Sequence, residues 1–181
     1  MRRIVHAIYV SLDGVVDEPA WTGPYFNDEL AALQHQLLFA SEALLLGRVT
    51  YEAFAASWPS MTHEGDFAER MNSMPKYVAS RTLKSTTWNA ALLPDDPVAE
   101  VARLKEEPGG DLLLFGSQSF ADALTAKGLI DEYRVMLFPT VVGVGARLFA
   151  AVTNTSLRLS ETVTTSTGVA VLTYCPAIEG G

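Results

Sequence analysis

Three kinds of residue are scarce in this chain, and each scarcity excludes a class of protein or site. Among the 181 residues there is one cysteine, Cys175, which excludes an intramolecular disulfide and a cysteine-based zinc site. His6, His35 and His63 lack HxxxH or HExxH spacing, so we expect no metal site. Lysine and arginine number 13 against 21 aspartates and glutamates, a net charge of −8. Because phosphate backbones need a basic face, nucleic acid is not an expected partner.

Long hydrophobic runs are also missing. No stretch approaches the ~20 apolar residues of a membrane helix, so we expect no membrane span. The opening MRRIVHAIYVSLDG resembles a signal peptide, but its apolar run is short and meets Asp13-Gly14 instead of a small-residue cleavage site. We interpret it as a first strand and expect a cytoplasmic protein. With 49% hydrophobic and 19% charged residues, global disorder is excluded, and we expect one domain over 1–181 with its core at 2–176.

Strand patterns alternate with helical patterns along the chain. This alternation predicts an α/β fold with a central, mostly parallel mixed sheet flanked by helices, and a C-terminal antiparallel hairpin. In such sheets, ligands bind at the carboxyl ends of the strands. The predicted strands are 4–11, 43–46, 76–80, 86–88, 111–115, 131–138, 157–164 and 169–174, and the predicted helices are one that starts after an Asn27 cap, then 49–57, 67–71, 97–107 and 119–127.

Three predicted strand ends carry glycine, hydroxyl or arginine residues just before or inside the following segment. Glycine allows close approach of a ligand, and a helix N-terminus offers free N–H groups and partial positive charge. Each strand end alone is typical of an ordinary turn, but three together favour an anion site. Two helix starts and two arginines suit a ligand with a pyrophosphate and a separate phosphate. The candidate cofactor-binding residues are Gly47, Arg48, Thr50, Ser80, Arg81, Thr82, Gly116, Ser117, Gln118 and Ser119.

Asp13 is the candidate catalytic residue, because it follows the first strand at the edge where ligands gather. Two other interpretations remain open. Asp13 is equally typical of a turn before Gly14. The Asp-x-Asp-Gly pattern of aspartyl phosphatases would need a carboxylate at position 11, where this chain has Ser11.

Two further sets of side chains have alternative interpretations. His6 alternates with apolar neighbours, which favours a buried core histidine. The aromatic residues Trp21, Tyr25 and Phe26 in the first long loop either form a wall of a substrate pocket or attach the loop to the core.

Taken in order, the motifs resemble a known family. The matching segments are SLDGV at 11–15, LLLGRVTYE at 44–52, PKYVASRTL at 75–83, LLLFGSQSF at 112–120 and GLIDEYRVMLFPTVVGVGARLF at 128–149, followed by the terminal hairpin. They resemble the dihydrofolate-reductase-like superfamily, and more closely the branch similar to the reductase domain of bifunctional riboflavin-biosynthesis deaminase-reductases. The resemblance spans nearly the whole chain.

The resemblance implies an NADPH-dependent reductase of a small heterocyclic or sugar-linked C=N or C=O substrate. The riboflavin-type substrate of this branch is 5-amino-6-(5-phosphoribosylamino)uracil. The three strand-end segments match the family's cofactor phosphate, adenosine and pyrophosphate segments, and Asp13 matches a position near the nicotinamide. A homodimer is also implied. One departure argues against a folate substrate: the family's acidic pterin-binding position falls near Ala31. The alternative is a non-catalytic nucleotide-binding module of the same fold.

Overall fold

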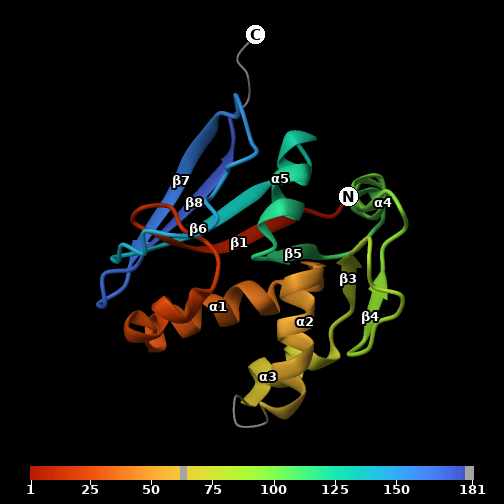
Figure 1. Cartoon of the computed structure of the whole chain (residues 1–181), viewed down its shortest axis with the longest axis horizontal. Coiled ribbons are helices and arrows are strands. Elements are labelled where there is room, and N and C mark those ends of the chain that lie inside the picture. Colours follow the sequence, from red (N-terminus) through yellow and green to blue (C-terminus); the bar gives the residue numbers. More distant parts are fainter. Residues whose placement is uncertain (62–64, 178–181) are drawn as a thin grey trace.

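The computed structural model describes residues 1–61 and 65–177, so His63 lies outside the described residues. Its elements alternate between strand and helix, as Figure 1 shows. The strands are β1 (Ile4–Ser11), β2 (Ser41–Gly47), β3 (Lys76–Ala79), β4 (Ala90–Leu92), β5 (Asp111–Phe115), β6 (Glu132–Phe138), β7 (Leu157–Thr164) and β8 (Ala170–Pro176). The helices are α1 (Asp28–Phe39), α2 (Arg48–Ser57), α3 (Gly65–Ser73), α4 (Pro97–Glu106) and α5 (Gln118–Ala126), with 3-10 turns η1 (Pro19–Tyr25) and η2 (Trp58–Ser60).

All eight strands belong to one sheet in the order β4-β3-β2-β5-β1-β6-β8-β7. The six strands from β4 to β6 are parallel, and β8 pairs antiparallel with both β6 and β7. Because parallel strands end at one edge, β2, β5 and β1 deliver their carboxyl ends to the same side of the sheet. The predicted α/β class, mixed sheet and terminal hairpin are confirmed.

The helices cover both faces of the sheet (Figure 1). On one face, α4 and α5 pack Val101, Leu104 and Leu124 against the strands. On the other, α1, α2 and α3 pack residues such as Leu30 and Met71. This sandwich explains why the central strands are apolar almost without interruption, since each is buried on two sides.

Capping residues define several helix ends. The side chain of Asn27 accepts a hydrogen bond from the N–H of Leu30 at 3.0 Å, which starts α1 as the sequence predicts. The side chain of Asp96 caps α4 in the same way, just before Pro97. Within the described residues, no helix is both long and apolar enough to cross a membrane.

The strand predicted over 86–88 is wrong, because the fourth strand is Ala90–Leu92. Trp88 has a positive φ of 57°, which removes it from any strand. Its indole nitrogen donates to the side chain of Asn72 at 2.5 Å, and its ring faces the Lys76 ammonium at 4.1 Å. These two distant partners hold Trp88 in a turn that local β-propensity does not reveal.

Candidate active site

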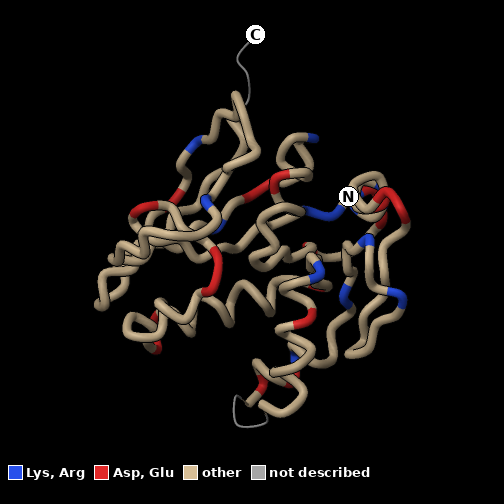
Figure 2. Tube along the Cα trace, viewed as in Figure 1, with Lys and Arg blue, Asp and Glu red and all other residues tan. Residues whose placement is uncertain are grey.

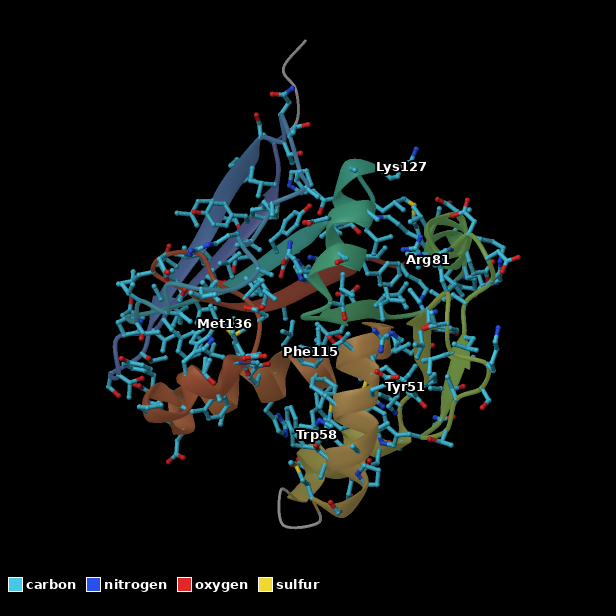
Figure 3. All side chains as sticks on the ribbon, viewed as in Figure 1. Tyr51, Trp58, Arg81, Phe115, Lys127 and Met136 are labelled. Atoms are coloured by element: carbon cyan, nitrogen blue, oxygen red, sulfur yellow. The ribbon has the colours of Figure 1, made fainter. Side chains whose placement is uncertain are left out.

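A cavity of about 830 Å³ opens between the sheet and the helices α1, α2 and α3. That volume lies within the range of about 300–1,000 Å³ typical of small-molecule sites. Its wall includes residues of β1, the starts of α2 and α5, one side of α1, and part of α3. Figure 3 shows Phe115 at the centre of this region and Trp58, the first residue of η2, beyond the end of α2 toward α3. The cavity therefore has two ends of different composition.

At one end, the carboxyl ends of β2 and β5 meet through Ser117. The N–H of Gly47 donates to the Ser117 hydroxyl at 2.8 Å, and that hydroxyl lies within donating distance of the Phe115 carbonyl (2.9 Å) and the Thr50 hydroxyl (3.1 Å). A Cβ on Gly47 would lie 3.3 Å from the Ser117 Cβ, closer than most real contacts. A side chain at position 47 would therefore press on the Ser117 side chain where the two strand ends approach each other.

The turn between β5 and α5 lines the same end of the cavity. Gly116 and Ser117 have positive φ angles of 51° and 55°, which turn β5 directly into α5. Neither α5 nor α2 has a side-chain cap, so their first N–H groups are left for another acceptor. Uncapped helix starts are places where proteins commonly bind anions, so anion binding at this end stays a prediction.

Arg48 lines this end and is the only lysine or arginine among the described residues of the cavity wall. Its guanidinium pairs with Glu52 on the next turn of α2 at 2.7 Å. Both side chains are nearly half exposed, so this pair is weak and leaves Arg48 available to an anionic ligand.

The third strand end lies beside the cavity instead of in its wall. Ala79 pairs in register with Gly47, so Ser80, Arg81 and Thr82 continue from the strand next to β2. None of these three residues lines the cavity. The Ser80 hydroxyl accepts hydrogen bonds from the N–H of Thr82 at 3.2 Å and from that of Leu83 at 3.0 Å. Figure 3 shows Arg81 near α4, away from Phe115. A role for this segment in cofactor binding stays a prediction.

Asp13 also lies outside the cavity wall, where it holds the loop after β6. Its carboxylate accepts from Ser11 (2.6 Å), from the N–H groups of Val142 (3.0 Å) and Gly143 (2.7 Å), and from Arg147 (3.1 Å). These bonds, that from Ser11 above all, lower the pKa of Asp13 well below its ordinary value. The Asp13 carboxylate holds a loop whose residue Ala146 lines the cavity. A direct contact between Asp13 and the substrate stays a prediction.

The burial of His6 confirms the prediction of a core histidine. It is fully buried, and its Nε2 lies 3.0 Å from the Gly116 carbonyl. Because a carbonyl only accepts, Nε2 carries the proton and donates. Burial lowers the pKa of His6 to about 4, so the ring is neutral at pH 7.

The floor between β1 and α1 contributes neutral polar groups. The Gln34 amide donates to the Tyr9 hydroxyl at 3.0 Å and contacts the Met136 sulfur at 3.0 Å. Burial raises the pKa of Tyr9 to about 12, so its hydroxyl keeps its proton. Ala31 lines the cavity one turn before His35, and it leaves no carboxylate at the expected pterin-binding position.

Aromatic side chains dominate the end of the cavity near α3. Trp58 packs against Phe67 with ring centroids 5.4 Å apart, and the His35 Nε2 donates a hydrogen bond to the Asp66 carboxylate at 2.9 Å. These wall residues come from three helices, so no contiguous sequence motif predicts them. The one available signal is the helical spacing of Ala31 and His35 on α1, which places both on one face.

The first-loop aromatics divide between the two proposed roles. Trp21 and Tyr25 pack edge-on against Phe138, at 5.6 Å and 6.2 Å between ring centroids, and so attach the loop to the core. Phe26 lines the cavity.

Comparison with known protein families identifies the family of this chain. The model of the RibD C-terminal domain matches residues 2–171. The chain belongs to the RibD C-terminal domain family. Membership of this family, together with the fold, supports a reductase-type role.

Individual relatives agree with this RibD-type assignment. YyaP of Bacillus subtilis (strain 168), whose name calls it uncharacterized, is 29% identical over 96% of this chain and 94% of its own length. A protein of Shewanella sp. PV-4, provisionally named for riboflavin biosynthesis, has a TM-score of 0.74 at 20% identity and covers 97% of this chain and 99% of its own. The dihydrofolate reductase of Enterococcus faecalis, solved with NADP(H), has a TM-score of 0.65 at 13% identity over 96% of both chains. These structural likenesses establish the shared fold.

Proposed function

We propose that this protein is an NADPH-dependent reductase that delivers hydride to a C=N or C=O carbon of a small heterocyclic or sugar-linked substrate. The observation that carries the proposal is the junction at Gly47 and Ser117. There two uncapped helix starts and the side chain of Arg48 border one cavity of about 830 Å³. The cavity is large enough to take a cofactor segment together with a substrate.

The residues present suit a phosphorylated dinucleotide. The N–H groups that begin α5 would take the pyrophosphate, and Arg48 would pair with a further phosphate. Thr50 and Ser119 offer hydroxyl donors at the two helix starts. Bound NADPH supplies the hydride, and the chain contributes binding, orientation and exclusion of water. The Tyr9 hydroxyl and the Gln34 amide would orient the acceptor by hydrogen bonds along the cavity floor.

A thermal-shift comparison of NADPH, NADH, FMN and ATP tests the proposal. A ligand that binds the native state raises the midpoint according to the logarithm of its concentration over its Kd. At equal concentration, NADPH should give the largest shift and NADH a smaller one. Equal shifts for NADPH and NADH would refute the role of Arg48, and no shift with either would refute the dinucleotide site.

The alternative is a nucleotide-binding module without catalysis, and the absence of a carboxylate at Ala31 is the observation that favours it. Steady oxidation of NADPH with a panel of pterin, pyrimidine and quinonoid acceptors would reject this alternative. Stoichiometric NADPH binding with no oxidation by any acceptor would favour it.

We also propose that the protein forms a homodimer. In its support, β7 is an edge strand of eight residues that is exposed along most of its length, including Leu159 and Val163. Such an edge is a ready template for pairing with a second copy. Light scattering coupled to size-exclusion chromatography should give twice the chain mass, and Val163→Lys should shift it toward the monomer. A monomer at every concentration would refute the dimer.

A further inference from the structure

The part of the cavity that faces away from the α5 start has no basic wall. From Ile4 to Gly47, a stretch that includes η1 and α1, the sequence contains no lysine or arginine. Figure 2 shows acidic positions and no basic ones along the segment between β1 and α1. Within the described part of the chain, Arg48 is the only lysine or arginine that lines the cavity, and it sits at the opposite, anion-binding end.

Three carboxylates line the cavity, and they come from two separate segments of the chain. Asp17 and Glu18 lie in the wall beside η1, and Asp66 lies in the wall at the start of α3. The hydrogen bond with His35 lowers the pKa of Asp66 below its ordinary value, so this carboxyl stays ionised near neutral pH. A phosphate placed here would face the Asp66 carboxylate, and the nearby basic side chain, His35, already bonds to that carboxylate.

The remaining wall is apolar or aromatic. Phe54 and Trp58 lie edge to face with ring centroids 6.4 Å apart. Trp58 also packs against Phe67, with ring centroids 5.4 Å apart. Met71 closes the same side. Flat aromatic ligands gain stacking and desolvation energy in such surroundings.

The floor recognises polarity without charge. The Tyr9 hydroxyl remains protonated, and Gln34 is a neutral carboxamide that donates to Tyr9 and Met136, so both of these wall side chains are polar and uncharged. A guanidinium or ammonium that would select an anionic substituent is absent from the described residues of this floor.

We propose that the substrate end accepts an aromatic heterocycle without any anionic group, and that it discriminates against the phosphoribosylated pyrimidine of riboflavin synthesis. This inference rests on the proposed reductase function and names the substrate class of that site. The proposed cofactor would occupy the end that holds Arg48, so the phosphate of a substrate would have only a wall without lysine or arginine available.

A matched pair of ligands tests the proposal: 5-amino-6-(ribosylamino)uracil and its 5′-phosphate. Each is titrated by calorimetry into the protein saturated with NADP⁺, at low ionic strength. We expect the nucleoside to bind at least about tenfold more tightly than the phosphate, because like charges face each other in a partly desolvated site. Raising the salt concentration should narrow the difference. Equal or tighter binding of the phosphate, or no binding of either compound, would overturn the proposal.

Two variants assign the effect to the carboxylates. Asp66→Asn and Glu18→Gln should each strengthen phosphate binding relative to nucleoside binding by about two- to tenfold. Glu106→Gln, on the exposed surface of α4 and away from the cavity, is the matched control and should change neither. An identical response of all three variants would overturn the role of the cavity carboxylates.

A separate experiment with the cofactor distinguishes the proposed reductase function from the inferred substrate class. NADPH alone is tested by thermal shift before either uracil is added. Absence of an NADPH shift would defeat the proposed function itself. An NADPH shift followed by preference for the phosphate would defeat only the substrate class inferred here.

Discussion

The two ends of the cavity are built in different ways. At the Arg48 end, backbone N–H groups, two glycines and Ser117 hold the strand ends together, and short contiguous motifs supply nearly all of these atoms. At the α3 end, side chains from three helices assemble an aromatic wall with carboxylates. The first construction suits a chemically constant ligand such as a cofactor, whereas the second allows substrate specificity to change by single side chains.

The largest expected effect concerns the support beneath the Arg48 end. His6 has a pKa of about 4 in the folded protein and about 6.5 when unfolded, so between these values the unfolded chain binds more protons. The free energy of unfolding should therefore be at its full value above pH 6.5. It should fall by about 3 kcal/mol as the pH drops to 4.

Urea unfolding at pH 7 and at pH 4.5 measures this loss. In His6→Gln, which cannot titrate, the part of the pH dependence between pH 6.5 and 4 should be much smaller. If the free energy of unfolding of His6→Gln depends on pH as steeply as that of the unchanged protein, other titratable groups cause the loss of stability. Asp13 does not interfere, because its lowered pKa places its contribution below pH 3.8.

The next effect separates the two arginines. Arg48→Ala should weaken NADPH binding by about ten- to a hundredfold, because one charge-assisted contact contributes about 1.5–3 kcal/mol. NADH binding should change much less. Arg81→Ala should have a smaller effect, since Arg81 lies outside the cavity wall.

Fluorescence titration of NADPH and NADH checks both variants. Glu52→Gln is the matched control, because it removes the partner of Arg48 without removing the guanidinium. It should leave NADPH binding unchanged or slightly tighter. If Arg81→Ala weakens NADPH binding more than Arg48→Ala does, then the segment after β3, and not the cavity wall at Arg48, makes the main contact with the cofactor phosphate.

A third change tests the junction itself. Ser117→Ala removes the acceptor of the Gly47 N–H and should lower the free energy of unfolding by about 1–2 kcal/mol. It should also weaken NADPH binding. Thr50→Val removes only the 3.1 Å hydrogen bond from the Ser117 hydroxyl and should lower the free energy of unfolding by a smaller amount. Chemical denaturation of both variants measures the difference, and equal losses would argue against Ser117 as the joint between the strand ends.

The smallest expected effect lies at the opposite end. Trp58→Leu keeps an apolar side chain but removes the ring that packs on Phe67. It should weaken binding of an aromatic heterocycle by about two- to tenfold, corresponding to about 0.5–1.5 kcal/mol for an aromatic contact. NADPH affinity should stay within about twofold. Loss of NADPH affinity equal to that of Arg48→Ala would show that the two ends are not independent.

Much of the fold was predictable because each element carries its own local signal. The bounds of β1, β5 and β7 match the predicted strands, and the Asn27 cap starts α1 as expected. The fourth strand was misplaced because Trp88 is held by Asn72 and Lys76, residues distant in sequence from the turn.

The site was predictable only in part for the same reason. Gly47, Arg48 and Ser117 lie in motifs at strand ends, and parallel topology brings those ends together. Asp13 stands at the predicted edge, but its carboxylate faces the loop after β6 instead of the cavity. Side-chain direction at a turn depends on partners that periodicity does not show.

The order of strands and helices, the glycines at the strand ends and the absence of basic residues from 4 to 47 are properties that the sequence alone determines. Short-range sterics and backbone hydrogen bonding are encoded by neighbouring residues, so they can be inferred without coordinates. The joining of Gly47 to Ser117, the neutral floor at Gln34 and the pairing of His35 with Asp66 were decided by tertiary structure. These contacts join residues far apart in the chain, and packing of the helices against the sheet selects among many arrangements that the local pattern allows equally.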